Sequence, residues 1–143
     1  PMNHSKIIGG KIEIKSKYKL TAKSLPVLYT PGVAEVSKAI AKNKKLSFEY
    51  TIRKNAVAVI SDGSAVLGLG NLGPEAALPV MEGKCLLFKE LAGVDAFPIV
   101  LNTQDTEEII KIIIKEVQLF TPKFIDSTFS ATLIQNLKFL TYL

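Results

Sequence analysis

Two side chains of this sequence are suited to proton transfer, the phenol of Tyr29 and the amine of Lys84. Tyr29 directly precedes Thr30-Pro31, a pair that favours the start of a helix, and Lys84 interrupts the apolar stripe of a second helical segment. Burial would favour the neutral amine, which is the form that a general base needs. The alternative interpretation is structural, with a lysine stem lying along Phe88 and a tyrosine filling the core. The residues alone leave both interpretations open.

The segment after Tyr29 predicts a helix that begins at Pro31. Proline suits the first helical position, and Thr30 before it suits the N-cap. Apolar residues then recur at helical spacing, at Val33, Val36 and Ile40. Because the start of a helix has free backbone N–H groups, we expect a site for a carboxylate or phosphate beside Tyr29.

The segments around Lys84 predict alternating strands and helices. Three apolar runs are typical of strands: residues 56–60, 65–69 and 96–101. Residues 80–91 predict a helix, and its apolar stripe contains Lys84 together with Met81, Leu87, Phe88 and Leu91. Asp105 and Glu108 form a capping box that opens another helix, to about Val117. This order of elements indicates an α/β fold.

A glycine-rich loop, Gly68 to Gly73, matches the dinucleotide fingerprint G-x-G-x-x-G. That fingerprint requires a helix running directly from the last glycine into a parallel strand, with an acidic residue at the end of that strand. Here Pro79 interrupts the segment, and Asp95 precedes the next predicted strand. We therefore favour a loop that lines a substrate pocket, with dinucleotide binding as the alternative.

Composition narrows the class of protein. The chain has 143 residues, of which 48% are hydrophobic, so it can form one compact domain with its own core. Its net charge is +5, but only residues 42–45 form a basic cluster and no aromatic residues interleave, so we expect no nucleic-acid partner. The single cysteine, Cys85, fits a reducing compartment and predicts a structural thiol. No run is long enough for a membrane span, and we expect a cytoplasmic protein.

Three motifs occur in order along the chain: LYTPGVA at residues 28–34, SDGSAVLGLGNLGP at residues 61–74 and PVMEGK at residues 79–84. Together they resemble the N-terminal domain of malic enzymes, and the short bacterial and archaeal type is the most similar. The resemblance implies a three-layer α/β/α domain with a small, mainly parallel sheet. We expect an N-terminal segment at residues 1–20, the malic-enzyme-like domain at 21–117 and a divergent tail at 118–143.

The resemblance also implies roles for individual residues. Tyr29 is expected to be the general acid that protonates the enol of pyruvate, and Lys84 the general base that takes the proton from the malate C2 hydroxyl. Gly70, Asn71 and Gly73 are expected to line the substrate pocket. Members of the family use NAD or NADP and a divalent metal, Mg²⁺ or Mn²⁺, and associate, so a homodimer is expected.

The sequence departs from the family pattern after about Phe120. Family members continue with Gly-Gly-Ile-Asn-Leu-Glu-Asp, whose carboxylates bind the metal, whereas Asp126 is the only acidic residue between Val117 and Leu143. We therefore expect no metal site in this chain and a truncated or frame-shifted end relative to a full-length ancestor. The NAD-binding domain that follows in the family is expected to be absent, so the chain alone should bind no cofactor and be inactive.

Two classes of function remain open at this point. The favoured interpretation is the substrate-binding part of an enzyme that converts malate to pyruvate and CO₂. The alternative is a non-catalytic dimerisation or small-anion-binding module with the same fold. Malate-dependent reduction of NAD or NADP distinguishes the two.

Overall fold

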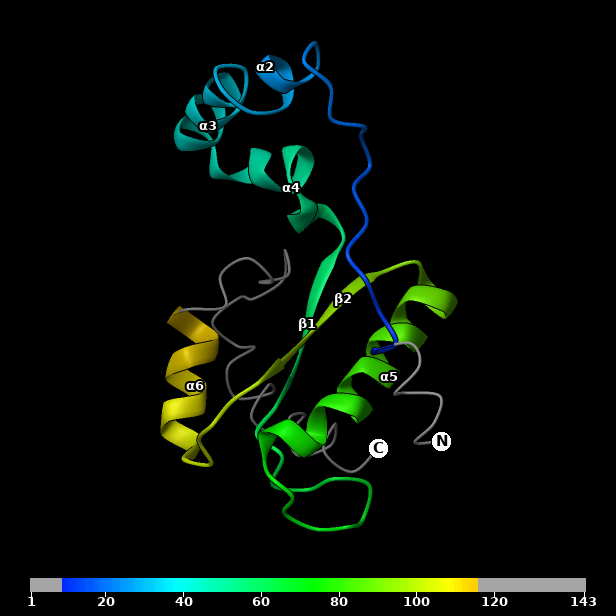
Figure 1. The fold of residues 1–143 in the computed structure, drawn as a ribbon. Helices are drawn as coiled ribbons and strands as arrows, with labels where there is room; N and C mark the ends of the chain where they lie inside the picture. The colour runs from blue at the N-terminus through cyan, green and yellow to red at the C-terminus, as the bar shows by residue number, and fades with distance from the viewer. Residues whose placement is uncertain (1–8, 116–143) are drawn as a thin grey trace. The chain divides into compact units, whose positions relative to one another are not determined.

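The computed structural model describes residues 9–115 of the chain (Figure 1). They belong to two compact units, one of residues 13–55 and one that combines the residues before 13 with those from 56 onward. We call the first the helical unit and the second the α/β unit. None of the helices described is long and apolar enough to cross a bilayer.

The α/β unit is built around two parallel strands. Strand β1 (Ala56–Ser61) pairs with β2 (Asp95–Val100), so that Ala56 lies opposite Asp95 and Ser61 opposite Val100. Parallel strands need a crossover connection, and helix α5 (Pro74–Ala92) supplies it. Helix α6 (Thr106–Lys115) follows β2. The predicted strands at residues 56–60 and 96–101 are therefore confirmed.

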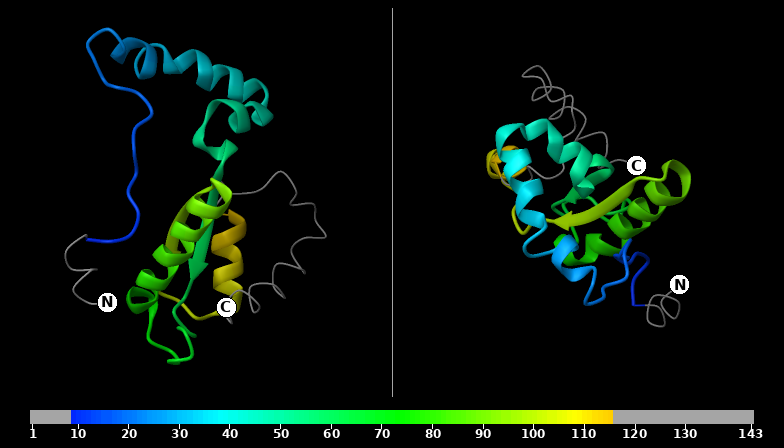
Figure 2. Two further views of the ribbon diagram at one scale, coloured as in Figure 1. Left: turned by 90° about the vertical axis from the view of Figure 1, so that its right-hand side faces the viewer. Right: turned by 90° about the horizontal axis from the view of Figure 1, so that it is seen from above.

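Three layers form the α/β unit. Helix α5 packs on both strands, and α6 lies on the other side of the strand pair (Figures 1 and 2). The buried apolar side chains are those of Ala56, Val66, Ala77, Met81 and Cys85. The fold is α/β with a small parallel sheet, as the sequence predicted.

Helix α5 is longer than predicted. It begins at Pro74, with Gly73 as N-cap, and continues through Pro79 without a break. Pro79 lies in the second turn of α5, where it removes the hydrogen bond to the carbonyl of Glu75 and its ring crowds that carbonyl, and the packing of α5 on both strands offsets this cost. The prediction that Pro79 interrupts this segment was therefore wrong.

The buried face of α5 also differs from the predicted stripe. Ala77, Met81 and Cys85, spaced four residues apart, are buried against the sheet. Leu87 and Leu91 are 57% and 82% exposed. Two strands cover only a narrow band of a helix, and the row of small and sulfur-containing side chains occupies that band.

Residues 65–69 form a turn, so the predicted strand there was wrong. The amide of Val66 donates to the carbonyl of Gly70 over 3.0 Å, and the amide of Leu69 donates to Val66 over 2.7 Å. Leu67 has a φ of 47°, a left-handed conformation that no strand contains. Apolar composition alone did not reveal this turn.

The helical unit consists of short helices. They are α2 (Leu25–Leu28), α3 (Val33–Lys42), a 3₁₀ turn (Lys44–Leu46), α4 (Ser47–Tyr50) and a second 3₁₀ turn (Ile52–Lys54). None of these helices contains a fully buried residue. In α4, the Phe48 ring lies 4.3 Å from the guanidinium carbon of Arg53, and this cation–π contact joins α4 to the second 3₁₀ turn.

Helix α3 begins two residues later than predicted, at Val33 with Gly32 as N-cap. The amide of Gly32 donates to the carbonyl of Pro26 over 2.7 Å. A Cβ atom at position 32 would lie 2.5 Å from the carbonyl oxygen of Val27, so only glycine permits this approach. The close contact between the two backbone segments sets the start of α3.

Candidate active site

The predicted glycine-rich segment belongs to a longer loop, residues 62–73, which leaves the carboxyl end of β1 and leads into α5. Its two ends are joined because the carbonyl of Gly63 accepts from the amides of Leu72 and Gly73, each over 3.2 Å. Gly63 has a φ of 71°, and a Cβ atom there would lie 2.0 Å from the Gly73 oxygen. At the loop start, the Asp62 carboxylate accepts from the amide and the hydroxyl of Ser64, over 3.0 and 2.8 Å. The loop therefore has a defined backbone path.

Asn71, a predicted substrate-binding residue, is held by a partner that the sequence analysis missed. Its Nδ2 donates to Oε1 of Gln104, and Nε2 of Gln104 donates back to Oδ1 of Asn71, each over 2.9 Å. Gln104 lies in the connection from β2 to α6. The available signal was its place after a predicted strand, since the carboxyl ends of parallel strands share one edge of a sheet.

The two predicted loop glycines lie on the same segment as Asn71. Gly70 is exposed, and Gly73 is half-buried at the N-cap of α5. The structure thus brings three of the five predicted site residues into one loop at the carboxyl edge of the sheet. This is the edge at which α/β proteins commonly bind ligands.

Lys84 and Tyr29 lie in different units. Lys84 is half-buried on α5, between the buried residues Met81 and Cys85. Tyr29 follows α2 in the helical unit, where its side chain is 66% exposed and does not fill the core of that unit. Each unit is described by itself, so the pairing of Tyr29 with Lys84 stays a prediction.

The predicted anion site at the start of the helix after Tyr29 is wrong. The amide of Val33 donates to the carbonyl of Tyr29 over 2.8 Å, and that of Ala34 donates to Pro31 over 3.0 Å. The amide of Glu35 is likewise bonded, to Gly32 over 3.3 Å. Because the turn before α3 already supplies acceptors, the first helical N–H groups are not free for a ligand.

The structure meets one requirement of the dinucleotide fingerprint and fails two others. Helix α5 does run directly from Gly73 into a parallel strand, contrary to the expectation based on Pro79. However, the glycines do not directly follow β1, which ends at Ser61. Asp95 is the first residue of β2, and its carboxylate accepts from Nζ of Lys89 over 2.7 Å. The acidic residue therefore lies at the wrong end of the strand for binding a ribose at the loop.

Cys85 is buried, with 1% of its surface exposed. Burial raises the pKa of the Cys85 thiol, and the negative charge of Glu82 raises it further. A thiol kept protonated is a poor nucleophile. The predicted structural role of this cysteine is consistent with its place in the core.

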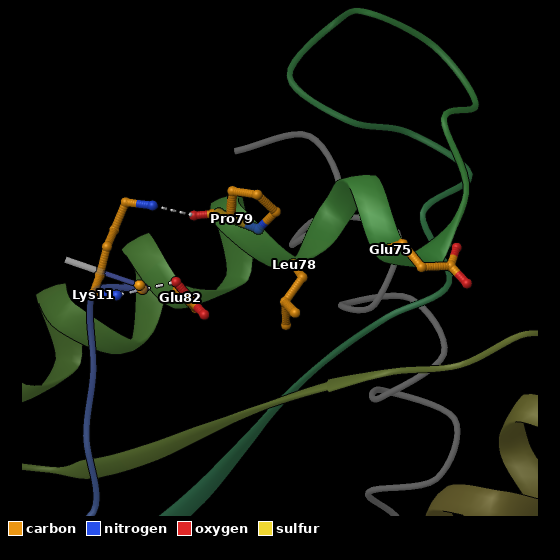
Figure 3. A pocket seen from close by; sticks show the side chains of 7 residues that line it. Lys11, Glu75, Leu78, Pro79 and Glu82 are labelled. Atoms are coloured by element: carbon orange, nitrogen blue, oxygen red, sulfur yellow. Dashed lines mark hydrogen bonds between the residues drawn. The ribbon is translucent and has the colours of Figure 1, made fainter. Parts of the chain in front are cut away.

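A cavity of about 270 Å³ lies between α5 and the chain before residue 12 (Figure 3). The backbone amide of Lys11 donates to the Glu82 carboxylate over 3.1 Å, and its Nζ donates to the carbonyl of Pro79 over 3.2 Å. Glu82 is thus half-buried and hydrogen-bonded to the chain before residue 12. Neither Lys84 nor Asn71 lines this cavity, so we place the candidate site at the loop instead.

No group of three or more histidine, cysteine, aspartate or glutamate side chains within residues 9–115 is arranged to hold a metal ion. The divergent tail, with Asp126, lies outside the described residues.

The fold is that of an α/β domain with an ordered loop at the carboxyl edge of its sheet, and comparison with known proteins gives the family. The family model for the N-terminal domain of malic enzyme matches residues 9–114. The chain is 62% identical over 107 residues to the NAD-dependent malic enzyme of Geobacillus stearothermophilus. It is 54% identical over 120 residues to the bifunctional malic/malolactic enzyme of Bacillus subtilis. The chain therefore belongs to the malic enzyme family.

The matched region is only part of each relative. The alignments cover 74% and 83% of this chain but 22% and 28% of the Geobacillus and Bacillus proteins. The crystal structure of the NAD-dependent malic enzyme of Thermotoga maritima matches with a TM-score of 0.76 at 50% identity, over 78% of this chain and 32% of that one. Other relatives are named NADP-dependent malic enzymes.

Proposed function

We propose that this domain supplies the malate-binding part of an enzyme that oxidises malate and releases CO₂ to give pyruvate. The observation that carries the proposal is the match of residues 9–114 to the N-terminal domain of malic enzyme, because it includes the loop that presents Asn71 at the carboxyl edge of the sheet. Malate carries two carboxylates and a hydroxyl. The free N–H and carbonyl lone pair of the Asn71 amide can bond to either kind of group.

Lys84 and Tyr29 have complementary roles in the proposal. Lys84 takes the proton from the C2 hydroxyl while hydride leaves C2, which gives a β-keto acid. The C3–C4 bond then breaks, CO₂ departs, and the electron pair remains as the enolate of pyruvate. Tyr29 delivers a proton to C3 of this enolate. The two roles differ because one step removes a proton from the C2 oxygen and the other supplies a proton to C3.

The cofactors are treated separately from these residues. NAD or NADP would accept the hydride, since both occur in the names of relatives. The described residues fit neither the dinucleotide fingerprint nor a divalent-metal site, so we assign no residue of this chain to either group. A homodimer and a cytoplasmic location complete the proposal.

The alternative function is a non-catalytic dimerisation or small-anion-binding module with the same fold. The N–H groups at the start of α3 donate to backbone carbonyls, so they offer no anion site for such a module. The dimerisation part of the alternative is compatible with the proposed enzyme and does not compete with it.

The test is malate-dependent reduction of NAD and of NADP in the presence of Mn²⁺. We expect activity when the chain is joined to the remaining part of the Geobacillus relative, and a loss of about 10² to 10⁴ in kcat for Lys84→Ala in that protein. Lys89→Ala is the matched control, because Lys89 lies on the same helix in an exposed ion pair with Asp95. Full activity of the Lys84→Ala variant would contradict the assigned role.

A further inference from the structure

The pairing of Asn71 with Gln104 joins two segments that are 33 residues apart in sequence. One segment leaves β1 and the other leaves β2, and both side chains are exposed. The two hydrogen bonds, each of 2.9 Å, form a closed amide–amide pair. Such a pair fixes the direction of both amide groups.

Fixed direction matters because an asparagine amide has two different ends. Its terminal torsion is broad and roughly two-fold, so an exposed asparagine interchanges its donor and its acceptor readily. In the pair, Asn71 uses one of two N–H groups and one of two lone pairs. The remaining N–H and the remaining lone pair therefore point in set directions from the loop.

We propose that Gln104 is a positioning residue that orients the Asn71 amide toward the carboxylate and hydroxyl of a bound 2-hydroxy diacid. The inference rests on the proposed function. The free N–H of Asn71 donates to a carboxylate oxygen, and its carbonyl accepts from a hydroxyl. Gln104 itself does not touch the substrate, and it acts by preventing rotation of the Asn71 amide.

A structural role for Gln104 makes a different prediction, and a double variant separates the two. Asn71→Gln combined with Gln104→Asn exchanges the two side chains and keeps the total length across the pair. It preserves the connection between the segments but moves the amide at position 71 outward by one methylene. A merely structural pair would tolerate this exchange, whereas a positioned ligand group would not.

The experiment measures two quantities on the 143-residue chain. Side-chain amide signals in ¹H–¹⁵N NMR spectra report whether the pair forms without any ligand, and titration with malate gives the dissociation constant. Asn102→Ala is the matched control, because Asn102 is exposed and lies two residues earlier in the same connection. Chemical denaturation of each variant shows whether folding is retained.

We expect Gln104→Ala to weaken malate binding about tenfold, because the Asn71 amide loses the orientation of one hydrogen bond to malate. The free energy of unfolding should be unchanged. Asn102→Ala should bind as the wild type does. The exchanged double variant should show paired amide signals but bind malate as weakly as Gln104→Ala.

Wild-type affinity in Gln104→Ala, or full recovery of affinity in the exchanged variant, would overturn the positioning role while leaving the proposed function intact. Failure of the wild-type chain to bind malate, with its paired amide signals present, would instead overturn the proposed function and the inference that rests on it.

Discussion

At the scale of single residues, neighbours on one helix lie in different surroundings. Lys84 and Cys85 are neighbours on α5, yet Cys85 is buried and Lys84 only half-buried. Helical spacing predicted an apolar stripe that included Lys84, Leu87 and Leu91. The buried face is narrower, because spacing alone does not show how wide the covering sheet is. The partner of Asn71 was also missed, although Gln104 follows a predicted strand, because the two side chains meet only through the parallel pairing of β1 and β2.

Cys85 gives a prediction about pH. Its raised pKa means that the folded protein retains the thiol proton at a pH where the unfolded chain, with a pKa of about 8.5, has lost it. Folding stability from this group is therefore complete below about pH 8.5 and decreases as the pH rises toward the folded pKa. Urea titrations at increasing pH should show this decrease.

The Cys85→Ala variant is the control for that measurement. It should be less stable than the wild type at neutral pH because of the lost core volume, but its stability should lack the thiol-dependent decrease at alkaline pH. Identical alkaline profiles in the two proteins would show that another group is responsible.

At the scale of elements, the positions of the strands, α6 and the loop follow from local sequence patterns. The Asp105 carboxylate accepts from the Glu108 amide over 2.8 Å, as the capping box predicts. The reciprocal bond is not formed, because the Glu108 carboxylate accepts from the Thr103 hydroxyl instead. The turn at residues 65–69 was missed because its apolar composition resembles a strand, although its hydrogen bonds are local. The passage of α5 through Pro79 was missed because packing of α5 on both strands outweighs the local preference of proline.

Alanine substitutions at two glycines, one in the loop and one inside α5, test how the backbone of each element limits the residue type. Gly63→Ala should destabilise the fold by at least about 2 kcal/mol, because the residue has a positive φ and its Cβ would meet the backbone of Gly73. Gly83→Ala, inside α5 with no atom near the added Cβ, should stabilise it by about 0.5–1 kcal/mol. Chemical denaturation measures both, and equal stabilities would contradict the assigned strain.

At the scale of the whole molecule, the helical unit and the α/β unit differ in how they are stabilised. The α/β unit has a small core around Met81 and Cys85, whereas none of the helices of residues 13–55 contains a buried residue. Val27 of the helical unit is 71% exposed and Tyr29 is 66% exposed. The proposed homodimer would cover such apolar side chains if they lie in its interface.

The homodimer is tested by sedimentation equilibrium. We expect a mass of twice 15.6 kDa for the chain, and a shift toward the monomer in Val27→Lys, because a charge in an apolar interface is costly to bury. Lys38→Ala, a change in an exposed ion pair of α3, should leave the mass unchanged. A monomer at all concentrations would contradict the proposal.

The sequence by itself determined the family, the α/β class and the loop that carries Asn71, because these depend on residue types in a fixed local order. The tertiary structure alone decided which face of α5 is buried, where residues 65–69 turn and that Gln104 holds Asn71. The buried face of α5 and the pairing of Gln104 with Asn71 arise when parallel strands bring distant segments to one edge and cover one band of a helix. The periodicity of one segment does not show which distant segment will contact it.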